Sequence, residues 1–182
     1  MGIVPQNKPQ YKREDAETIL KIYKKPLDRC YLIAFRGYYS QTFQPRGNNI
    51  GVYDDALVVI SPDTFATFNF NVDPSSQATG RANLCAGIWQ FEIGIHNRSK
   101  AKSKQYTALI QDEAQFLIKR FNQGTKLESY RGINLHRGGN TTTSSLGCLT
   151  VPPIQWDSAI NLIIAQMNKH NQKKIELILI DL

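Results

Sequence analysis

Apolar and polar residues alternate with a period of two in several short segments, and this alternation restricts the chain to a fold built mainly of β-strands. In residues 89–95 the alternation places Trp89, Phe91, Ile93 and Ile95 on one face, as a half-buried strand requires. Loops rich in Gly, Asn, Pro and Ser, such as residues 40–53, separate the segments. Strands are predicted over residues 30–38, 56–61, 64–72, 87–95, 106–110, 115–121, 127–136 and 174–180.

Two further segments have the spacing of amphipathic helices. In residues 14–25 apolar side chains recur every three or four positions, and Pro26 is expected to end the helix. Residues 156–167 carry a single apolar stripe, preceded by Pro152 and Pro153, where a missing N–H costs little. The sequence therefore predicts a mainly β, α+β fold with two helices packed against the sheet. A polar N-terminal arm is expected over residues 1–13 and a single domain over residues 14–182.

Charge and hydropathy narrow the set of partners and the site of action. The formal net charge of +7 favours anionic partners, or serves solubility alone. The only basic cluster, residues 98–104, has no aromatic residues between its charges, so nucleic-acid binding is not expected. The chain has no apolar run long enough for membrane insertion. Its first ten residues lack the apolar core of a secretory signal, which predicts synthesis in the cytoplasm.

A histidine and a cysteine stand at the two ends of a loop rich in glycine, threonine and serine. His136 ends a predicted strand, and Cys148 follows twelve positions later. A thiol attacks a carbonyl carbon as thiolate, and a neighbouring imidazole can take its proton. The pattern predicts Cys148 as nucleophile and His136 as base. Cys30 and Cys85 lie in apolar sequence surroundings and are expected to be buried, and three cysteines do not suit a disulfide framework.

Other residues near this pair are candidates for supporting roles. Gly147 has no side chain and would let a substrate approach, and the backbone N–H groups of residues 146–148 are candidates for an oxyanion hole. Arg137 is a candidate for pairing with a substrate carboxylate. His96, at the end of the predicted strand 87–95, is a candidate second imidazole. The residues expected to shape the loop or orient the imidazole are Gly138, Ser144 and Ser145.

The run His136-Arg-Gly-Gly139, followed by Ser145-Leu-Gly-Cys148, resembles the active site of the L,D-transpeptidases, the YkuD-type catalytic domain. In that family a His-Gly pair precedes Ser/Thr-His-Gly-Cys. His136 matches the family's base, Ser145 its Ser/Thr, Gly147 its glycine and Cys148 its nucleophile. Residues 130–157 are more specifically similar to small phage- and prophage-encoded proteins, and secreted antibacterial effectors of this fold also have a shortened His-to-Cys loop.

The resemblance implies a β-sandwich or barrel with two flanking helices, and a cysteine enzyme that needs no cofactor or metal. The implied partners are peptidoglycan stem peptides, which would form a thioester with Cys148, and an immunity or delivery protein. The implied site of action is the bacterial cell wall or periplasm, after delivery from the cytoplasm. Leu146 stands where the family usually has a second histidine, and Thr150 where Arg or Asn is common. Hydrolysis and transpeptidation therefore both remain open.

Two other functions are compatible with the same residues. A zinc amidase or peptidase could use His96, His136 and Cys148, although the chain has no His-Glu-x-x-His or Cys-x-x-Cys arrangement. A wall-binding or virion structural module could keep the fold without turnover, and the missing second histidine favours that alternative.

Overall fold

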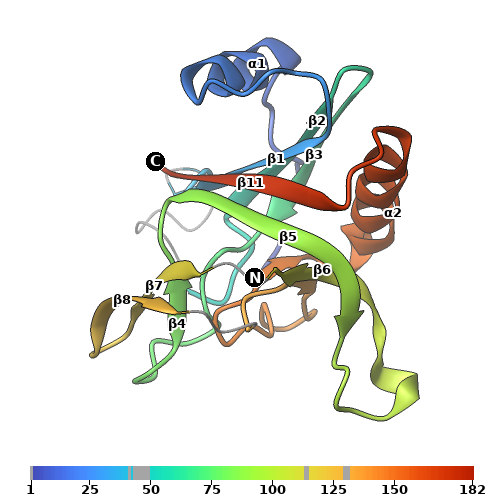
Figure 1. Ribbon diagram of the computed structural model, residues 1–182. Coiled ribbons are helices and arrows are strands. Elements are labelled where there is room, and N and C mark those ends of the chain that lie inside the picture. Colours follow the sequence, from blue (N-terminus) through green and yellow to red (C-terminus); the bar gives the residue numbers. More distant parts are fainter. Residues whose placement is uncertain (1, 41, 43–49, 113–114, 129–131) are drawn as a thin grey trace.

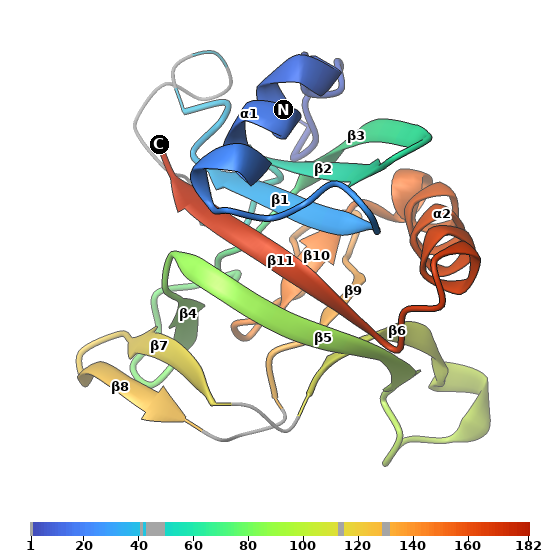
Figure 2. The same cartoon turned by 45° about the horizontal axis from the view of Figure 1, so that its top comes forward.

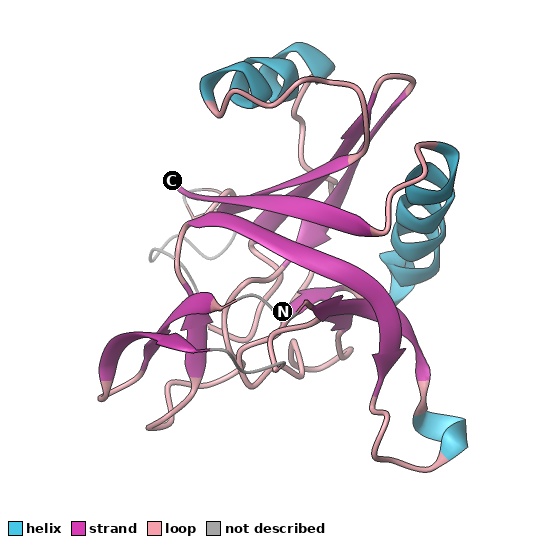
Figure 3. Ribbon diagram, viewed as in Figure 1, coloured by secondary structure: helices cyan, strands magenta, loops and turns pink. Residues whose placement is uncertain are grey.

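Strands dominate the backbone, in agreement with the predicted mainly β, α+β fold (Figures 1 and 3). A computed structural model describes residues 2–40, 42, 50–112, 115–128 and 132–182. The larger sheet has eight strands in the order β10-β9-β6-β5-β11-β1-β2-β3, and the smaller has three in the order β4-β7-β8. In both cartoon views the smaller sheet and helix α2 lie at opposite sides of the molecule (Figures 1 and 2), and both contribute side chains to the same apolar core.

The bounds of the elements follow the chain. The strands of the larger sheet are β1 (Tyr31–Arg36), β2 (Asp55–Ser61), β3 (Thr64–Phe70), β5 (Gly87–His96), β6 (Tyr106–Gln111), β9 (Leu135–Arg137), β10 (Leu149–Val151) and β11 (Lys174–Asp181). Those of the smaller sheet are β4 (Ala82–Leu84), β7 (Phe116–Arg120) and β8 (Gly124–Glu128). The helices are α1 (Arg13–Ile22), α2 (Pro153–Lys169) and the short 3-10 helix η1 (Lys102–Lys104).

The two edge strands of the larger sheet meet and nearly close it into a barrel. Asn71, directly after β3, pairs with Thr150 of β10 through two backbone hydrogen bonds of 2.9 and 2.8 Å. The side-chain amide of Asn71 also donates to the Asp73 carbonyl at 2.8 Å and to the Thr150 hydroxyl at 3.1 Å. All three residues are fully buried, so these bonds form away from water, where an unpaired polar group is costly.

The two helices cover opposite faces of the central strands. Leu32 and Ala34 of β1 pack in the larger apolar core, which includes the buried stripe of α2. Tyr31 and Ile33 point to the other face and pack in a second core under α1. Because both faces of β1 are covered, its sequence is continuously apolar and does not alternate.

The helix predicted over residues 14–25 ends earlier than expected, at Ile22. Lys24 adopts a left-handed conformation with φ of 54°. The N–H of Lys25 donates to the Leu20 carbonyl at 2.8 Å, and that of Lys24 donates to Lys21 at 3.0 Å. This closing motif satisfies the last carbonyls of the helix. The backbone closure, and not Pro26, therefore ends α1.

The prediction of one continuous strand over residues 127–136 is wrong. The segment contributes the end of β8 to the smaller sheet and β9 to the larger one, and residues 129–131 lie outside the described residues, as does most of the predicted loop 40–53. The half-buried face predicted for β5 is also only partly correct. Ile93 and Ile95 are 39% and 43% exposed because the hairpin of β5 and β6 projects beyond the barrel (Figure 1).

Residues 2–12, the described part of the polar segment before α1, contain no helix or strand, yet they lie against the barrel. The Tyr53 N–H donates to the Ile3 carbonyl at 2.8 Å, and the Tyr11 ring stacks on Phe35 with centroids 4.1 Å apart.

No helix in the described ranges has the length and apolar content needed to cross a membrane.

Replacing Asn71 tests how much its side chain contributes to closing the barrel. Asn71→Ala removes the donor to the buried Asp73 carbonyl, so the free energy of unfolding should fall by about 2–3 kcal/mol. Urea denaturation measures this change. Asn168→Ala, at an exposed position of α2, is the matched control and should leave stability unchanged or slightly raised. Equal effects of the two substitutions would show that the Asn71 side chain does not help to close the barrel.

Candidate active site

A pocket of about 630 Å³ lies between the two sheets. Ala82 and Ile118 line it from the smaller sheet, and His96 and His136 line it from the larger sheet. The loop before β10 contributes residues 144, 146, 147 and 148. The pocket thus gathers side chains from segments far apart in the sequence, and it has the size of a small-ligand site.

His136 and Cys148 reach this pocket from neighbouring parallel strands. His136 pairs with Thr150 in the β9–β10 register, and Cys148 directly precedes β10. The Cys148 thiol donates to the Gly132 carbonyl at 3.1 Å and accepts the Asn134 N–H at 3.5 Å. Within the described ranges, no hydrogen bond joins the thiol to His136. The strand pairing therefore brings Cys148 and His136 to one pocket, with the thiol hydrogen directed at the Gly132 carbonyl.

The hydrogen bonding of His136 fixes which nitrogen can act as a base. Its Nδ1 lies 2.7 Å from the Arg137 carbonyl oxygen. A carbonyl oxygen only accepts, so Nδ1 carries the proton and Nε2 holds the lone pair. The Tyr106 hydroxyl lies 3.4 Å from the same nitrogen and 3.4 Å from the same carbonyl, which adds a third group to the contact. Nε2 is the atom that can accept a proton.

The second imidazole, His96, stacks directly on the first. The rings of His96 and His136 have centroids 4.0 Å apart and an interplanar angle of 20°. Asn134 faces His96 with its amide nitrogen, 3.3 Å from Nδ1, because its amide oxygen accepts the Gln111 N–H at 3.4 Å. Asn134 also donates its backbone N–H to the Cys148 sulfur at 3.5 Å. Asn134 thus contacts both the Cys148 sulfur and the His96 imidazole.

Burial keeps all three reactive groups uncharged at neutral pH. It lowers the pKa of His136 to about 4, with a further lowering by His96 that the bond to the Arg137 carbonyl partly offsets. Burial also lowers the pKa of His96 and raises that of Cys148, the latter partly offset by the Asn134 N–H. The resting site is therefore a neutral thiol beside neutral imidazoles, and not a thiolate–imidazolium pair.

Ser145 stabilises the turn that carries the Cys148 thiol. Its hydroxyl donates to the Cys148 carbonyl at 2.6 Å and accepts the Gly147 N–H at 3.0 Å. Its own N–H donates to Ser75 Oγ at 2.7 Å. Because the Gly147 N–H is engaged, only the N–H groups of Leu146 and Cys148 remain candidates for an oxyanion hole. In the described part of the chain neither of these two N–H groups has a hydrogen-bond partner.

The two glycines are required by packing. Gly147 has φ of +144°, and a Cβ there would lie 2.7 Å from the Ala82 Cβ and 2.8 Å from its carbonyl oxygen. A Cβ on Gly138 would overlap the Tyr53 hydroxyl and lie 2.9 Å from the Thr143 carbonyl oxygen. The sequence predicted that Gly147 leaves room for substrate. Gly147 lines the pocket, and its lack of a side chain also lets it pack against Ala82 of β4.

Arg137 does not reach the pocket, contrary to its predicted role as a substrate-carboxylate ligand. Its guanidinium lies over the Tyr106 ring, 5.0 Å from the centroid, and the side chain is exposed. Successive side chains of a strand point to opposite faces, so a buried His136 turns the next residue outward. Ser144, also predicted to support the site, lines the pocket with φ of 54° and an exposed side chain.

Sequence reasoning missed three residues of the site: Tyr106, Asn134 and Arg81. Asn134 is two positions before His136, so the period of a strand could have placed both on one face. Arg81 lines the pocket from the segment before β4. No local pattern marks Arg81 or Tyr106, because only the pairing of distant strands brings them to the site.

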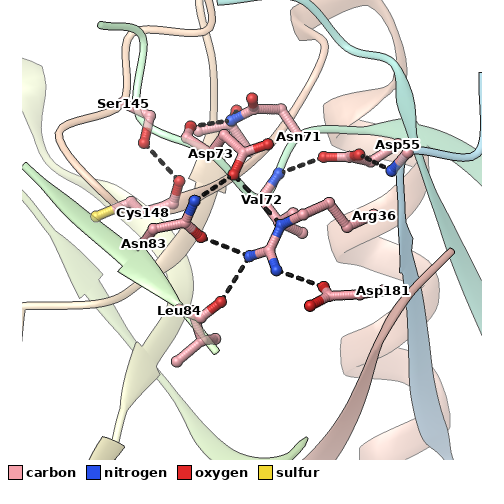
Figure 4. A network of polar contacts seen from close by, with 12 residues as sticks. Arg36, Asp55, Asn71, Val72, Asp73, Asn83, Leu84, Ser145, Cys148 and Asp181 are labelled. Carbon is pink, nitrogen blue, oxygen red and sulfur yellow. Dashed lines mark hydrogen bonds and ion pairs between the residues drawn. The ribbon is translucent and has the colours of Figure 1, made fainter. Parts of the chain in front are cut away.

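A buried polar network anchors the smaller sheet beside the loop that carries Cys148 (Figure 4). The Arg36 guanidinium lies 3.3 Å from Asp73 and donates to Asn83 Oδ1 at 2.6 Å and to the Leu84 carbonyl at 2.5 Å. Asn83 in turn donates to Asp73 at 2.7 Å. In Figure 4 the Cys148 sulfur points away from this network, which therefore holds the wall of the pocket in place without facing the thiol.

A metal site has no ligand set in the described residues. No group of three or more His, Cys, Asp or Glu side chains there is arranged so that it could hold a metal ion. The two imidazoles lie face to face, whereas imidazole ligands point their nitrogens toward a shared centre. The zinc alternative therefore gains no support from this geometry.

Cys30 and Cys85 lie outside this chemistry, and only one fits the predicted burial. Cys30 is fully buried, whereas Cys85 is partly exposed.

Comparisons of the chain with protein-family models, with curated proteins and with solved structures found no match.

The lowered pKa of His136 predicts a pH-dependent stability. Between its ordinary value of 6.5 and the folded value of about 4, the unfolded chain binds the proton more readily. The stability that neutral His136 contributes is thus fully present above pH 6.5 and falls by about 3 kcal/mol as the pH drops to 4. In urea denaturation between pH 4 and 6.5, the free energy of unfolding should depend clearly less on pH for His136→Gln than for the unsubstituted protein. The same pH dependence for both proteins would contradict the burial of a neutral imidazole.

Proposed function

We propose that the protein is a cysteine peptidase or transpeptidase that acts on peptidoglycan stem peptides through a thioester on Cys148. The observation that carries the proposal is the pocket shared by Cys148 and His136, in which Nε2 of His136 holds the lone pair. The resemblance of the His136–Cys148 segment to the L,D-transpeptidases supports the substrate class. A phage-derived or secreted protein that attacks the bacterial cell wall after delivery fits this activity.

The reaction consists of two acyl transfers. The Cys148 sulfur attacks the carbonyl carbon of a stem-peptide bond while its proton passes to Nε2 of His136. The tetrahedral oxyanion accepts hydrogen bonds from the free N–H groups of Leu146 and Cys148. The C–N bond breaks, the amine leaves with the proton from His136, and a thioester remains. Water then gives hydrolysis, whereas a second amine gives exchange, and either acceptor releases the thiol.

The raised pKa of Cys148 suits proton transfer that accompanies attack. A thiol bonded to the Gly132 carbonyl stays protonated until a substrate carbonyl enters the pocket. Turning the thiol from Gly132 toward His136 would then couple deprotonation to bond formation. Catalytic hydrogen bonds are often loose before substrate binds and tighten in the complex.

The same resting geometry favours one other function, a wall-binding module without turnover. An inert structural cysteine would also have a protonated thiol with a raised pKa, bonded to a backbone carbonyl. The two functions differ in what they require of Cys148. An enzyme needs its sulfur for turnover, whereas a binding module does not.

Purified sacculi separate these functions. Mass spectrometry should detect new muropeptide fragments or exchanged terminal residues after incubation with the protein, and Cys148→Ala should abolish them while binding to sacculi persists. Cys85→Ala, a partly exposed cysteine outside the described pocket lining, is the matched control and should keep the activity. A chelator should have no effect on a thiol mechanism. Unchanged sacculi, or equal products from Cys148→Ala, would contradict the proposal.

The pH profile of turnover should have an unusually low acid limb. Neutral His136 is the reactive form, and its pKa of about 4 extends that form well below the ordinary imidazole range. The value of kcat/KM should therefore be level from about pH 5 through neutral pH. His136→Gln should lower kcat/KM by about 10²- to 10⁴-fold. An acid limb near pH 6.5, in protein that circular dichroism shows to be folded, would contradict this assignment.

A further inference from the structure

The pocket that holds the proposed nucleophile has a positively charged wall. Its described lining includes two arginines, Arg81 and Arg120, and no aspartate or glutamate. A cleft lined by charge of one sign concentrates ligands of the opposite sign. The ligand that suits this wall is therefore anionic close to the reacting group.

The two arginines differ in what they contact. Arg120 donates to the Gly80 carbonyl at 2.6 Å, so it holds the wall together. The Arg81 guanidinium has no hydrogen bond, ion pair or ring contact with any residue in the described ranges. Its backbone is nevertheless fixed, because its N–H donates to the Ala78 carbonyl at 3.1 Å and its carbonyl accepts the Phe121 N–H at 3.0 Å. The backbone of Arg81 is therefore fixed, while its guanidinium is unpaired among the described residues.

The backbone around Arg81 is coupled to the turn that carries the thiol. The next residue, Ala82, donates its N–H to the Leu146 carbonyl at 3.3 Å and packs directly against Gly147. Arg81 and Cys148 therefore lie on adjoining parts of one pocket. A peptide residue spans at most about 3.6 Å, so a carboxylate one residue beyond the scissile bond stays within a pocket of this size.

We propose that Arg81 binds the C-terminal carboxylate of the stem-peptide residue that leaves when the thioester forms. The inference rests on the proposed function and narrows it to bonds next to a free carboxyl end. The guanidinium fork matches a carboxylate in a bidentate arrangement. This assigns to Arg81 the carboxylate contact that the sequence predicted for Arg137.

The test compares two peptides in a protein that cannot turn over. A stem tetrapeptide with a free C-terminal carboxylate, and the same peptide with only that carboxylate amidated, are titrated into Cys148→Ala by calorimetry. Amidation should weaken binding about 10- to 100-fold. In Cys148→Ala/Arg81→Met both peptides should bind with the same, weaker affinity. Arg98→Met in place of Arg81→Met is the control for a lost arginine, at an exposed position outside the described pocket lining, and should keep the preference.

Three results would overturn the assignment: no preference when Arg81 is present, the same preference after Arg81→Met, or no binding of either peptide. The sacculus assay with the unsubstituted protein distinguishes failure of the Arg81 assignment from failure of the proposed function. Turnover of sacculi without an Arg81-dependent preference would support the proposed enzymatic activity and overturn the assignment of Arg81. An Arg81-dependent preference without turnover would support the assignment of Arg81 and overturn the proposed enzymatic activity.

Discussion

The site depends on the pair of backbone hydrogen bonds between Asn71 and Thr150. Strand β10 has only three residues, and its other neighbour, β9, joins β6 through the single pair of Leu109 and Leu135. Strands this short do not stay paired without support on both sides. The bonds of Asn71 supply the second side, and they fix the backbone two residues after Cys148. The buried Arg36 and Asp73 pair then holds the opposite wall, so the pocket has fixed sides before any ligand enters.

Within the pocket, burial is the main cause of the lowered pKa of His136, and the stacked imidazole of His96 adds to it. Two rings at 4.0 Å cannot both be charged without strong repulsion, so His96 lowers the pKa of His136 further. Leu146 occupies the position where the resembling family has a second histidine, and the structure places an imidazole beside His136 from β5 instead. The resulting site holds a protonated thiol beside two neutral imidazoles.

The sequence could predict the parts of this structure that depend on local periodicity. The stripe of α2 and the alternation of β11 span several turns or pleats, so their buried faces follow from the spacing alone. Strands β4 and β10 have three residues each and carry no periodicity, which is why they were missed. The proximity of His136 and Cys148 follows from a short connection between neighbouring strands. Arg81 enters the site only through the pairing of β4 with β7, a non-local contact that no motif marks.

We propose that the Cys148 sulfur becomes acylated with His136 as the base, and rapid-quench intact-mass spectrometry is the decisive measurement. A stem peptide mixed with the protein and quenched in acid should add the mass of the acyl fragment, and fragmentation should map that mass to Cys148. Hydroxylamine should remove the adduct, and His136→Gln should slow its formation. An adduct on another residue, or product released in a quenched sample with no adduct on Cys148 at any time point, would contradict the account.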